Sequence, residues 1–181
     1  MKDKIGDDLR ARNSAWNFKG SVAKNFHNHI ARSIPFYING QELVTQISDF
    51  FIKEDSICYE LGCSTGALTN MLAKRHISKK KARFVGIDIE KDMIRQANKK
   101  KSKSNVKFVC GDAAKFKLKK SDLIVSYYTT QFIRPSERQI FFKKIFSALK
   151  WGGAFILFEK VRARDARFQD MTTGLYNEFK L

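Results

Sequence analysis

Short apolar runs alternate with longer segments of helical periodicity through most of the chain. Five runs have the length and the β-branched or aromatic content of buried strands, and they cover residues 56–62, 83–89, 106–112, 122–128 and 154–160. Helical segments lie between and after them, at residues 41–51, 67–75, 91–100, 136–149 and 163–179. Strands separated by helices pair in parallel through right-handed crossovers. The pattern therefore predicts an α/β fold with a central parallel sheet of about five strands flanked by helices.

The first 40 residues differ from this pattern. They mix polar and aromatic residues, and Pro35 follows a predicted helix at about residues 20–33. We expect residues 1–40 to form a helical extension or lid. Residues 41–181 are expected to form a single Rossmann-like domain.

The helix expected at residues 136–149 has readable signals at both ends. It follows Pro135, and Ser136 is the expected N-cap. Gly152 and Gly153 come after it, and glycine is common just past a helix end. We expect the helix to stop at this glycine pair and the last strand to follow it.

The size and composition of the chain fit one globular domain. It has 181 residues, 43% of them hydrophobic, which is enough for a buried core. No apolar run reaches the roughly 18–20 residues of a membrane span, and the charged first ten residues do not read as a secretory signal. Cys58, Cys63 and Cys110 lack zinc-site spacing, and His27 and His29 have no acidic or cysteine cluster beside them. We expect a cytoplasmic protein with no membrane segment and no bound metal.

The net charge is strongly positive, at +17 from 35 Lys and Arg against 18 Asp and Glu. Such an excess attracts polyanions, and nucleic acid is a common one. The lysine runs at 79–81, 99–101 and 119–120 fall where helix ends and connections are expected, which also suits lysines that only solvate the surface. The sequence leaves direct contact with nucleic acid open.

The segment "CYELGCSTGALT" (58–69) contains two overlapping motifs. Gly62, Ser64 and Gly66 fit G-x-S-x-G, the turn that exposes the nucleophilic serine of α/β-hydrolases. That mechanism needs an acid and then a histidine later in the chain, yet the only histidine after Ser64 is His76, one helix away. The hydrolase turn also follows several strands, whereas here it follows the first. We therefore reject a serine nucleophile.

The same segment fits a cofactor-binding turn. Glu60 precedes it, and Gly62 and Gly66 lead into a helix, where glycine lets the backbone approach a ligand. Asp88 ends the second strand and Asp112 the third. Ligands of parallel sheets bind outside the carboxyl ends of the strands, where carboxylates accept hydrogen bonds from ribose hydroxyls. The sequence thus predicts one nucleoside site across three strand ends.

Further motifs narrow the nucleoside. The glycine spacing is not the G-x-G-x-x-G of dinucleotide sites, and no G-x-x-x-x-G-K-[ST] loop exists. An acidic residue two positions before the turn suits a ligand with an ammonium and a sulfonium, as in S-adenosylmethionine. Together with "GIDI" (86–89), "CGDA" (110–113), "DLIVSYYTTQF" (122–132) and "LKWGGAFILFEK" (149–160), the turn resembles that of class I S-adenosylmethionine-dependent methyltransferases. The resemblance implies a Rossmann-like sheet in the order 3-2-1-4-5.

A closer resemblance extends over essentially the whole chain. The segments "WNFKGSVAKNFHNHIARSIPFY" (16–37), "TTQFIRPSERQ" (129–139) and "GLYNEFK" (174–180) look like those of the carboxy-S-adenosylmethionine synthase family. The resemblance implies an enzyme that converts S-adenosylmethionine and prephenate to carboxy-S-adenosylmethionine and phenylpyruvate. A partner enzyme then uses the product to modify the tRNA wobble uridine. The resemblance also implies a homodimer, and it identifies no catalytic acid or base.

The same resemblance places cofactor-binding positions at Tyr37, Gly62, Cys63, Ser64, Asp88, Ile89, Asp112 and Ala113. Glu60 and Gly66 join this set from the motif itself. Tyr127 stands where the family tends to carry an asparagine that contacts the cofactor, and it completes the expected site. The expected ligand is S-adenosylmethionine or its carboxylated form.

The end of the chain leaves the activity open. The family continues past the position of Leu181 with further strands and an arginine that grips the extra carboxylate. We expect a fragment, a chain completed by a partner or a second copy, or a minimal cofactor binder. The spacing does not select a replacement among Arg134, Arg162, Arg164 and Arg167. The alternative functions are a conventional methyltransferase acting on tRNA or another substrate, and a truncated, non-catalytic paralogue.

Overall fold

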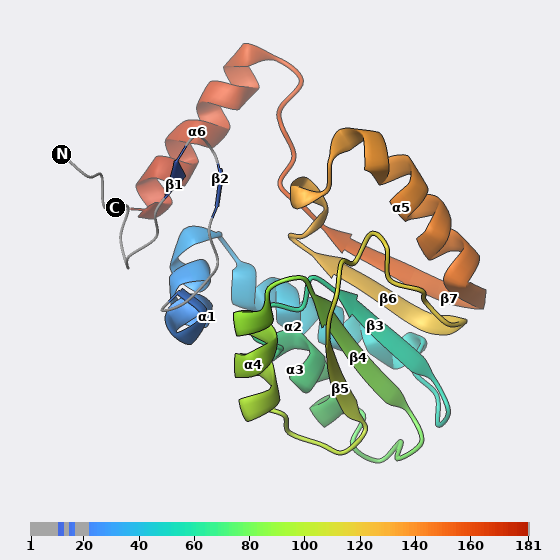
Figure 1. Cartoon of the computed structure of the whole chain (residues 1–181). Helices are drawn as coiled ribbons and strands as arrows, with labels where there is room; N and C mark the ends of the chain where they lie inside the picture. The colour runs from blue at the N-terminus through green and yellow to red at the C-terminus, as the bar shows by residue number, and fades with distance from the viewer. Residues whose placement is uncertain (1–10, 13–14, 17–21, 181) are drawn as a thin grey trace.

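The computed structural model describes residues 11–12, 15–16 and 22–180 (Figure 1). Its main feature is a five-stranded sheet in the order β5-β4-β3-β6-β7, in which every neighbouring pair is parallel. The strands are β3 (Ile57–Leu61), β4 (Arg83–Asp88), β5 (Val106–Cys110), β6 (Ser121–Tyr127) and β7 (Leu149–Phe158). Numbered within this sheet, the order is 3-2-1-4-5, as the sequence predicts.

Helices cover both faces of the sheet, and alternate residues of each strand point to opposite faces. One face packs against α2 (Tyr37–Ile47), α3 (Ala67–Arg75) and α4 (Lys91–Lys99), with Leu68 and Leu72 among the fully buried contacts. The other packs against α5 (Pro135–Ala148), where Phe141 and Ile145 meet Leu61. The sheet is thus a buried middle layer.

The remaining elements lie outside these layers. A short hairpin is formed by β1 (Ala11–Arg12) and β2 (Ala15–Trp16), and α1 (Val22–Ser33) contacts α2 and α4. Single 3-10 turns, η1 (Ser48–Phe50) and η2 (Thr130–Phe132), follow α2 and β6. Helix α6 (Ala166–Lys180) follows an extended linker, and no residue of it is buried (Figure 1).

Two expected boundaries can be compared with the helix starts. Residue 40 lies inside α2, which begins at Tyr37 after Phe36 in a left-handed conformation (φ 56°), and the division into an extension and a domain stays a prediction. The expected N-cap Ser136 lies inside α5, which begins at Pro135. Proline suits this first position because its missing N–H has no partner there in any helix.

The glycine pair does not end the helix as expected. Helix α5 ends at Ala148, one residue before the expected 149, and Gly152 and Gly153 lie inside β7. The pairing register shifts between Ser121 and Leu123 opposite this stretch, and Gly152 has a φ of 75°. The glycines therefore accommodate a bulge in the strand.

Candidate cofactor site

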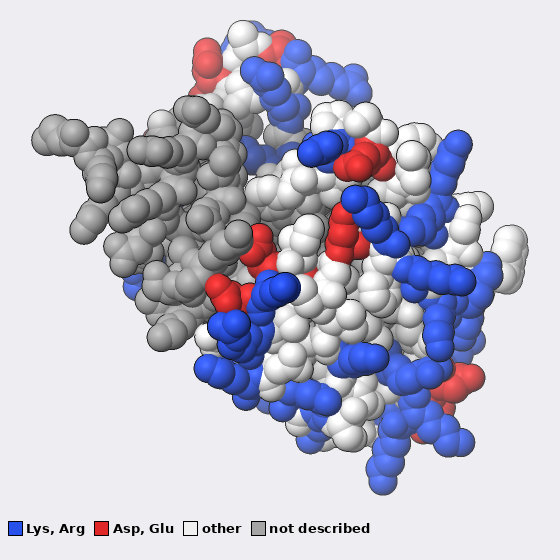
Figure 2. Space-filling view, viewed as in Figure 1, with Lys and Arg blue, Asp and Glu red and all other residues white. Residues whose placement is uncertain are grey.

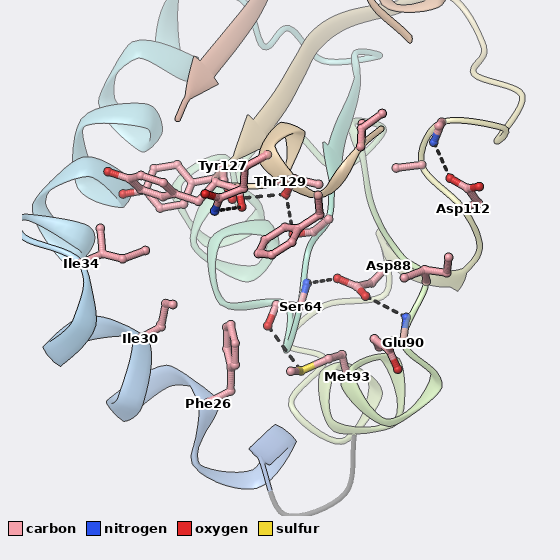
Figure 3. Close-up of a pocket in the computed structure, with 18 of the residues that line it drawn as sticks. Phe26, Ile30, Ile34, Ser64, Asp88, Glu90, Met93, Asp112, Tyr127 and Thr129 are labelled. Carbon is pink, nitrogen blue, oxygen red and sulfur yellow. Dashed lines mark hydrogen bonds between the residues drawn. The ribbon is translucent and has the colours of Figure 1, made fainter. Parts of the chain in front are cut away.

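A cavity of about 350 Å³ opens at the carboxyl ends of the central strands (Figure 3). Its floor comes from the segments that follow β3, β4, β5 and β6, and α1 supplies one wall. Figure 3 shows Phe26 and Ile30 of α1, and Ile34 directly after it, on the side opposite Ser64 and Asp88. The expected residues on the lining are Tyr37, Gly62, Ser64, Asp88, Ile89, Asp112, Ala113 and Tyr127.

The turn after β3 is held by its own backbone. The N–H groups of Gly62 and Cys63 both donate to the carbonyl of Ile87, at 2.8 and 2.9 Å. Gly62 has a φ of 79°, and a Cβ there would lie 2.1 Å from Oγ1 of Thr129. Glycine at this position therefore lets the turn close against the end of β6 while it lines the cavity.

Gly66 is placed differently from the expectation. It begins α3 with a φ of 76°, but it is not on the cavity lining. A Cβ there would lie 2.4 Å from the ring of Phe108. Gly66 therefore makes room for the ring of Phe108 on strand β5, and its role toward the cofactor stays a prediction.

Asp88 joins two of the site's loops. Its Oδ2 accepts the N–H of Ser64 at 2.7 Å and its Oδ1 accepts the N–H of Glu90 at 2.9 Å. Burial raises the pKa of this carboxyl, and the two backbone hydrogen bonds oppose that rise. Each carboxylate oxygen keeps a second lone pair, so Asp88 can accept further hydrogen bonds at the cavity surface.

Asp112 has a similar role one strand further on. Its Oδ1 accepts the N–H of Ala114 at 2.8 Å, which closes a tight turn after β5. The ammonium of Lys115 lies 3.7 Å from Oδ2. Asp112 and Ala113 both line the cavity, and Figure 3 shows Asp112 on the side away from α1.

Glu60 lies beneath the turn, with only 4% of its surface exposed. It lines a small pocket together with Tyr37, Cys63 and Ser64. Its Oε2 accepts the hydroxyl of Thr69. Burial raises the pKa of Glu60 to about 8, the Thr69 hydrogen bonds oppose the rise, and the charge of Asp88 adds to it.

Three tyrosines pack together beside Glu60. The hydroxyl of Tyr127 donates to the carbonyl of Tyr37 at 2.6 Å, and the two rings meet edge to face at 5.1 Å. Tyr128 stacks on Tyr37 at 6.0 Å and has a φ of 54°. Burial raises the pKa values of all three phenols, so they are neutral donors and acceptors.

The sequence did not identify part of the lining. Phe26, Ile30 and Ile34 recur every fourth residue, a spacing that indicates one apolar face of a helix. This spacing predicts an apolar helix face, but it does not predict which part of the protein that face covers. Tyr128 carries no sequence signal for its left-handed backbone.

The geometry also rules out the serine nucleophile. The hydroxyl of Ser64 lies 3.5 Å from the sulfur of Met93. His76 is buried at the other end of α3, where its Nε2 lies 2.7 Å from the hydroxyl of Ser48. Within the described residues, no group of three or more His, Cys, Asp or Glu could hold a metal, and the side chain of His27 lies outside them.

The charge of the site is negative. Among the described residues, the cavity lining contains Asp88, Glu90 and Asp112 and no Lys, Arg or His. These three acids favour a ligand that carries positive charge. The same part of the chain contains no helix long and apolar enough to cross a bilayer.

Comparison with known protein families gives a consistent result. Residues 59–153 match the family model described as a methyltransferase domain. The carboxy-S-adenosyl-L-methionine synthase of Staphylococcus epidermidis is 34% identical over 167 residues, covering 92% of this chain and 72% of that protein. The synthase of Salmonella arizonae is 32% identical over 174 residues, covering 94% and 70%.

Solved structures share the fold. A TehB-like SAM-dependent methyltransferase from Corynebacterium glutamicum superposes with a TM-score of 0.56 at 20% identity, covering 87% of this chain and 78% of that one. A DhpI–SAM–HEP complex gives a TM-score of 0.59 at 17% identity, covering 83% and 67%. The family expected from the sequence is confirmed: this chain belongs to the carboxy-S-adenosyl-L-methionine synthase family, a branch of the S-adenosylmethionine-dependent transferases.

Proposed function

We propose that the cavity binds S-adenosylmethionine and that the enzyme uses prephenate to convert it to carboxy-S-adenosylmethionine. The other products are phenylpyruvate and water, because the hydroxide that leaves prephenate takes up the proton lost from the methyl group. The observation that carries the proposal is the acidic cavity across the ends of β3, β4 and β5, in a chain of this family. The cofactor has the two positive groups and the nucleoside that such a cavity accommodates. Pockets of this size are typical of small-molecule sites.

Each end of the cofactor has candidate partners. Asp88 accepts hydrogen bonds from the ribose hydroxyls, and Asp112 with Ala113 and Ile89 holds the adenine edge. The turn Gly62-Cys63-Ser64 supports the methionine part from below. Glu60 holds a proton below about pH 8 in the free protein and releases it to face the ammonium, and Gly66 acts only through the position of α3. Burial of Asp88 supports its role, because charged groups interact more strongly where water is excluded.

The tyrosine cluster suits the sulfonium. Aromatic rings attract cations through their negative faces, and Tyr37 and Tyr127 lie against the pocket that also contains Glu60. When bound, the sulfonium acidifies its methyl group, which is the chemistry that carboxylation requires. The residues of this chain would hold that group against the second substrate and exclude water, a task of proximity rather than of acid–base catalysis.

One feature favours a second candidate function. Prephenate carries two carboxylates, yet no cationic side chain is among the described lining residues. Carboxylation therefore needs a cation from outside that lining. Conventional methyl transfer to tRNA or another acceptor does not need one, and it is our alternative proposal.

The two functions can be separated by incubating the protein with S-adenosylmethionine, with and without prephenate, and analysing the cofactor by mass spectrometry. A prephenate-dependent gain of one carbon dioxide on the cofactor supports carboxylation. Binding in a calorimeter without that gain, together with labelled methyl on bulk tRNA, supports the alternative. Absence of binding at about millimolar cofactor, where binding free energy is only about 4 kcal/mol, contradicts both.

We also propose that the protein is a homodimer. Helix α6 supports this because Phe168, Met171, Leu175 and Phe179 recur on one face and are all exposed. An apolar face of this kind commonly marks an interaction surface.

A further inference from the structure

Lysine segments gather at the end of the sheet where the strands begin. The acids of the cofactor site lie at the carboxyl edge of the sheet. At the opposite edge, the segments that lead into β4, β5 and β6 carry Lys79–Lys81, Lys99–Lys101 with Lys103, and Lys119–Lys120. Because all five strands are parallel, these three lysine segments share one edge. We name this set of residues the basic edge.

The lysines of the basic edge are not neutralised within the described part of the chain. The Lys and Arg ion pairs found there are Arg75–Asp49, Arg95–Asp92, Lys115–Asp112 and Lys150–Asp122. Lys79 and Lys120 instead donate to the carbonyls of Ile52 and Leu149. Figure 2 shows Lys and Arg side chains concentrated along the lower and right margins, where the strands begin in Figure 1.

Exposed aromatic side chains border the basic edge. Trp151 is fully exposed, at 104% of its reference area, and Phe146 is 81% exposed. Both flank the start of β7, where the ammonium of Lys120 lies 3.4 Å from the carbonyl of Leu149. The bulge at Gly152 lies next to Trp151, and space around that glycine is open. A fully exposed tryptophan is uncommon in a folded domain.

We propose that the basic edge, with Trp151 and Phe146, is a binding surface for single-stranded nucleic acid. Lysines bind the phosphate backbone by charge and release counterions. Exposed rings stack on unpaired bases, which a duplex does not present. A lipid surface would use the same charge and bury the same ring, so vesicle binding is measured beside oligonucleotide binding.

The geometry separates this surface from the cofactor cavity. Five strands at about 4.8 Å spacing make an edge roughly 20 Å wide, enough for several nucleotides. The length of strands β3 to β6 separates that edge from the cavity by about 17–20 Å. Nucleic acid bound at the basic edge therefore does not enter the active site, and its binding does not depend on cofactor or on the proposed reaction.

The test is the affinity of the full chain for a fluorescent single-stranded oligouridylate of about 15 nucleotides, measured by anisotropy across a salt series. The variant K80E/K81E/K100E/K101E reverses four charges on the basic edge. The matched control, R162E/R164E/R167E/K180E, makes the same charge change near and on α6. A second pair compares Trp151→Ala with Phe168→Ala, which removes an exposed ring from α6.

We expect the basic-edge variant to bind at least about tenfold more weakly at about 0.1 M salt and to reduce the salt slope by about 2–3. The α6 control should change affinity less than about twofold beyond its effect on net charge. Trp151→Ala should weaken binding about fivefold or more, and Phe168→Ala should not. A matching DNA oligonucleotide distinguishes an RNA-specific surface from a general one. Cofactor affinity should be unchanged in the basic-edge variant and in Trp151→Ala.

Three results would overturn the proposal. One is the absence of oligonucleotide binding by the wild type at low salt. Another is equal loss in the two charge variants, which would show a response to net charge alone. The third is unchanged oligonucleotide affinity in Trp151→Ala. In that case binding to phosphatidylserine vesicles, or burial of Trp151 in a dimer, would account for the exposed ring.

Discussion

The carboxyl group of Glu60 is buried, and burial raises its pKa to about 8 from the ordinary 4.5. The folded chain therefore holds a proton that the unfolded chain releases. This proton contributes stability below about pH 4.5, and the contribution is lost as the pH rises through 8. Glu60→Gln, which stays neutral, should flatten the dependence by up to about 1.4 kcal/mol per pH unit in urea unfolding at pH 5 and 8. Glu178→Gln replaces an exposed carboxyl group and should keep the wild-type dependence of unfolding free energy on pH. The same dependence in both variants would contradict a raised pKa at Glu60.

Asp88 supports two loops with one carboxylate, so its replacement should affect the cofactor more than the fold. Asp88→Asn leaves a single carbonyl oxygen to accept the N–H groups of Ser64 and Glu90. We expect cofactor affinity in calorimetry to fall by about tenfold or more, since hydrogen bonds to charged groups contribute about 1.5–3 kcal/mol. Asp170→Asn on the exposed α6 is the control. Unchanged affinity in Asp88→Asn would remove the ribose role.

Replacing Gly62 or Gly174 by alanine should change the free energy of unfolding in opposite directions. Gly62→Ala forces a left-handed backbone and a contact with Thr129, so it should lower the free energy of unfolding by about 2 kcal/mol or more. Gly174 lies in α6 with nothing within 4 Å, so Gly174→Ala should raise helix stability by about 0.5–1 kcal/mol. Urea titration measures both; a tolerated alanine at Gly62 would show that the turn can open away from β6.

Helix α2 and strand β6 are joined at the site by one hydrogen bond. The hydroxyl of Tyr127 meets the carbonyl of Tyr37 in the first turn of α2. Tyr127→Phe should cost about 1 kcal/mol of stability and loosen the ring of Tyr37 over the pocket, which weakens cofactor binding. Tyr176→Phe removes an exposed hydrogen bond to Ser33 and should cost less than about 0.5 kcal/mol. An equal loss of stability in Tyr127→Phe and Tyr176→Phe, measured by thermal unfolding, would show that the buried hydrogen bond of Tyr127 contributes no more than the exposed one.

The strands were predictable because each is a short apolar run, and a parallel sheet then fixes which ends meet. Asp88 and Asp112 were found for this reason: both come at or just after a strand end. The interpretation of two glycine positions from the sequence differs from their contacts in the folded protein. The glycine pair after α5 serves a bulge instead of a helix end, and Gly66 serves packing against Phe108.

For the protein as a whole, the amount of charge is read from the sequence, whereas its distribution is read from the structure. The count of +17 does not distinguish a solvated surface from a binding surface. Only the parallel order of the strands brings the lysine segments to one edge and the site's acids to the other. The wall formed by α1 was not predictable either, because its apolar face does not specify the element it covers.

Helix α6 is the largest part of the described fold with no buried residue. A 15-residue helix is marginal in water without packing, so its apolar face is best stabilised by a partner, and a second copy supplies the same face. Leu175→Glu should therefore shift sedimentation toward a 20.9 kDa species as concentration falls, while the wild type stays heavier. Thr173→Glu adds the same charge on the other side of the helix and should leave the assembly intact. A wild type that sediments as a monomer at every concentration, or equal behaviour of the two variants, would show that α6 does not join two copies.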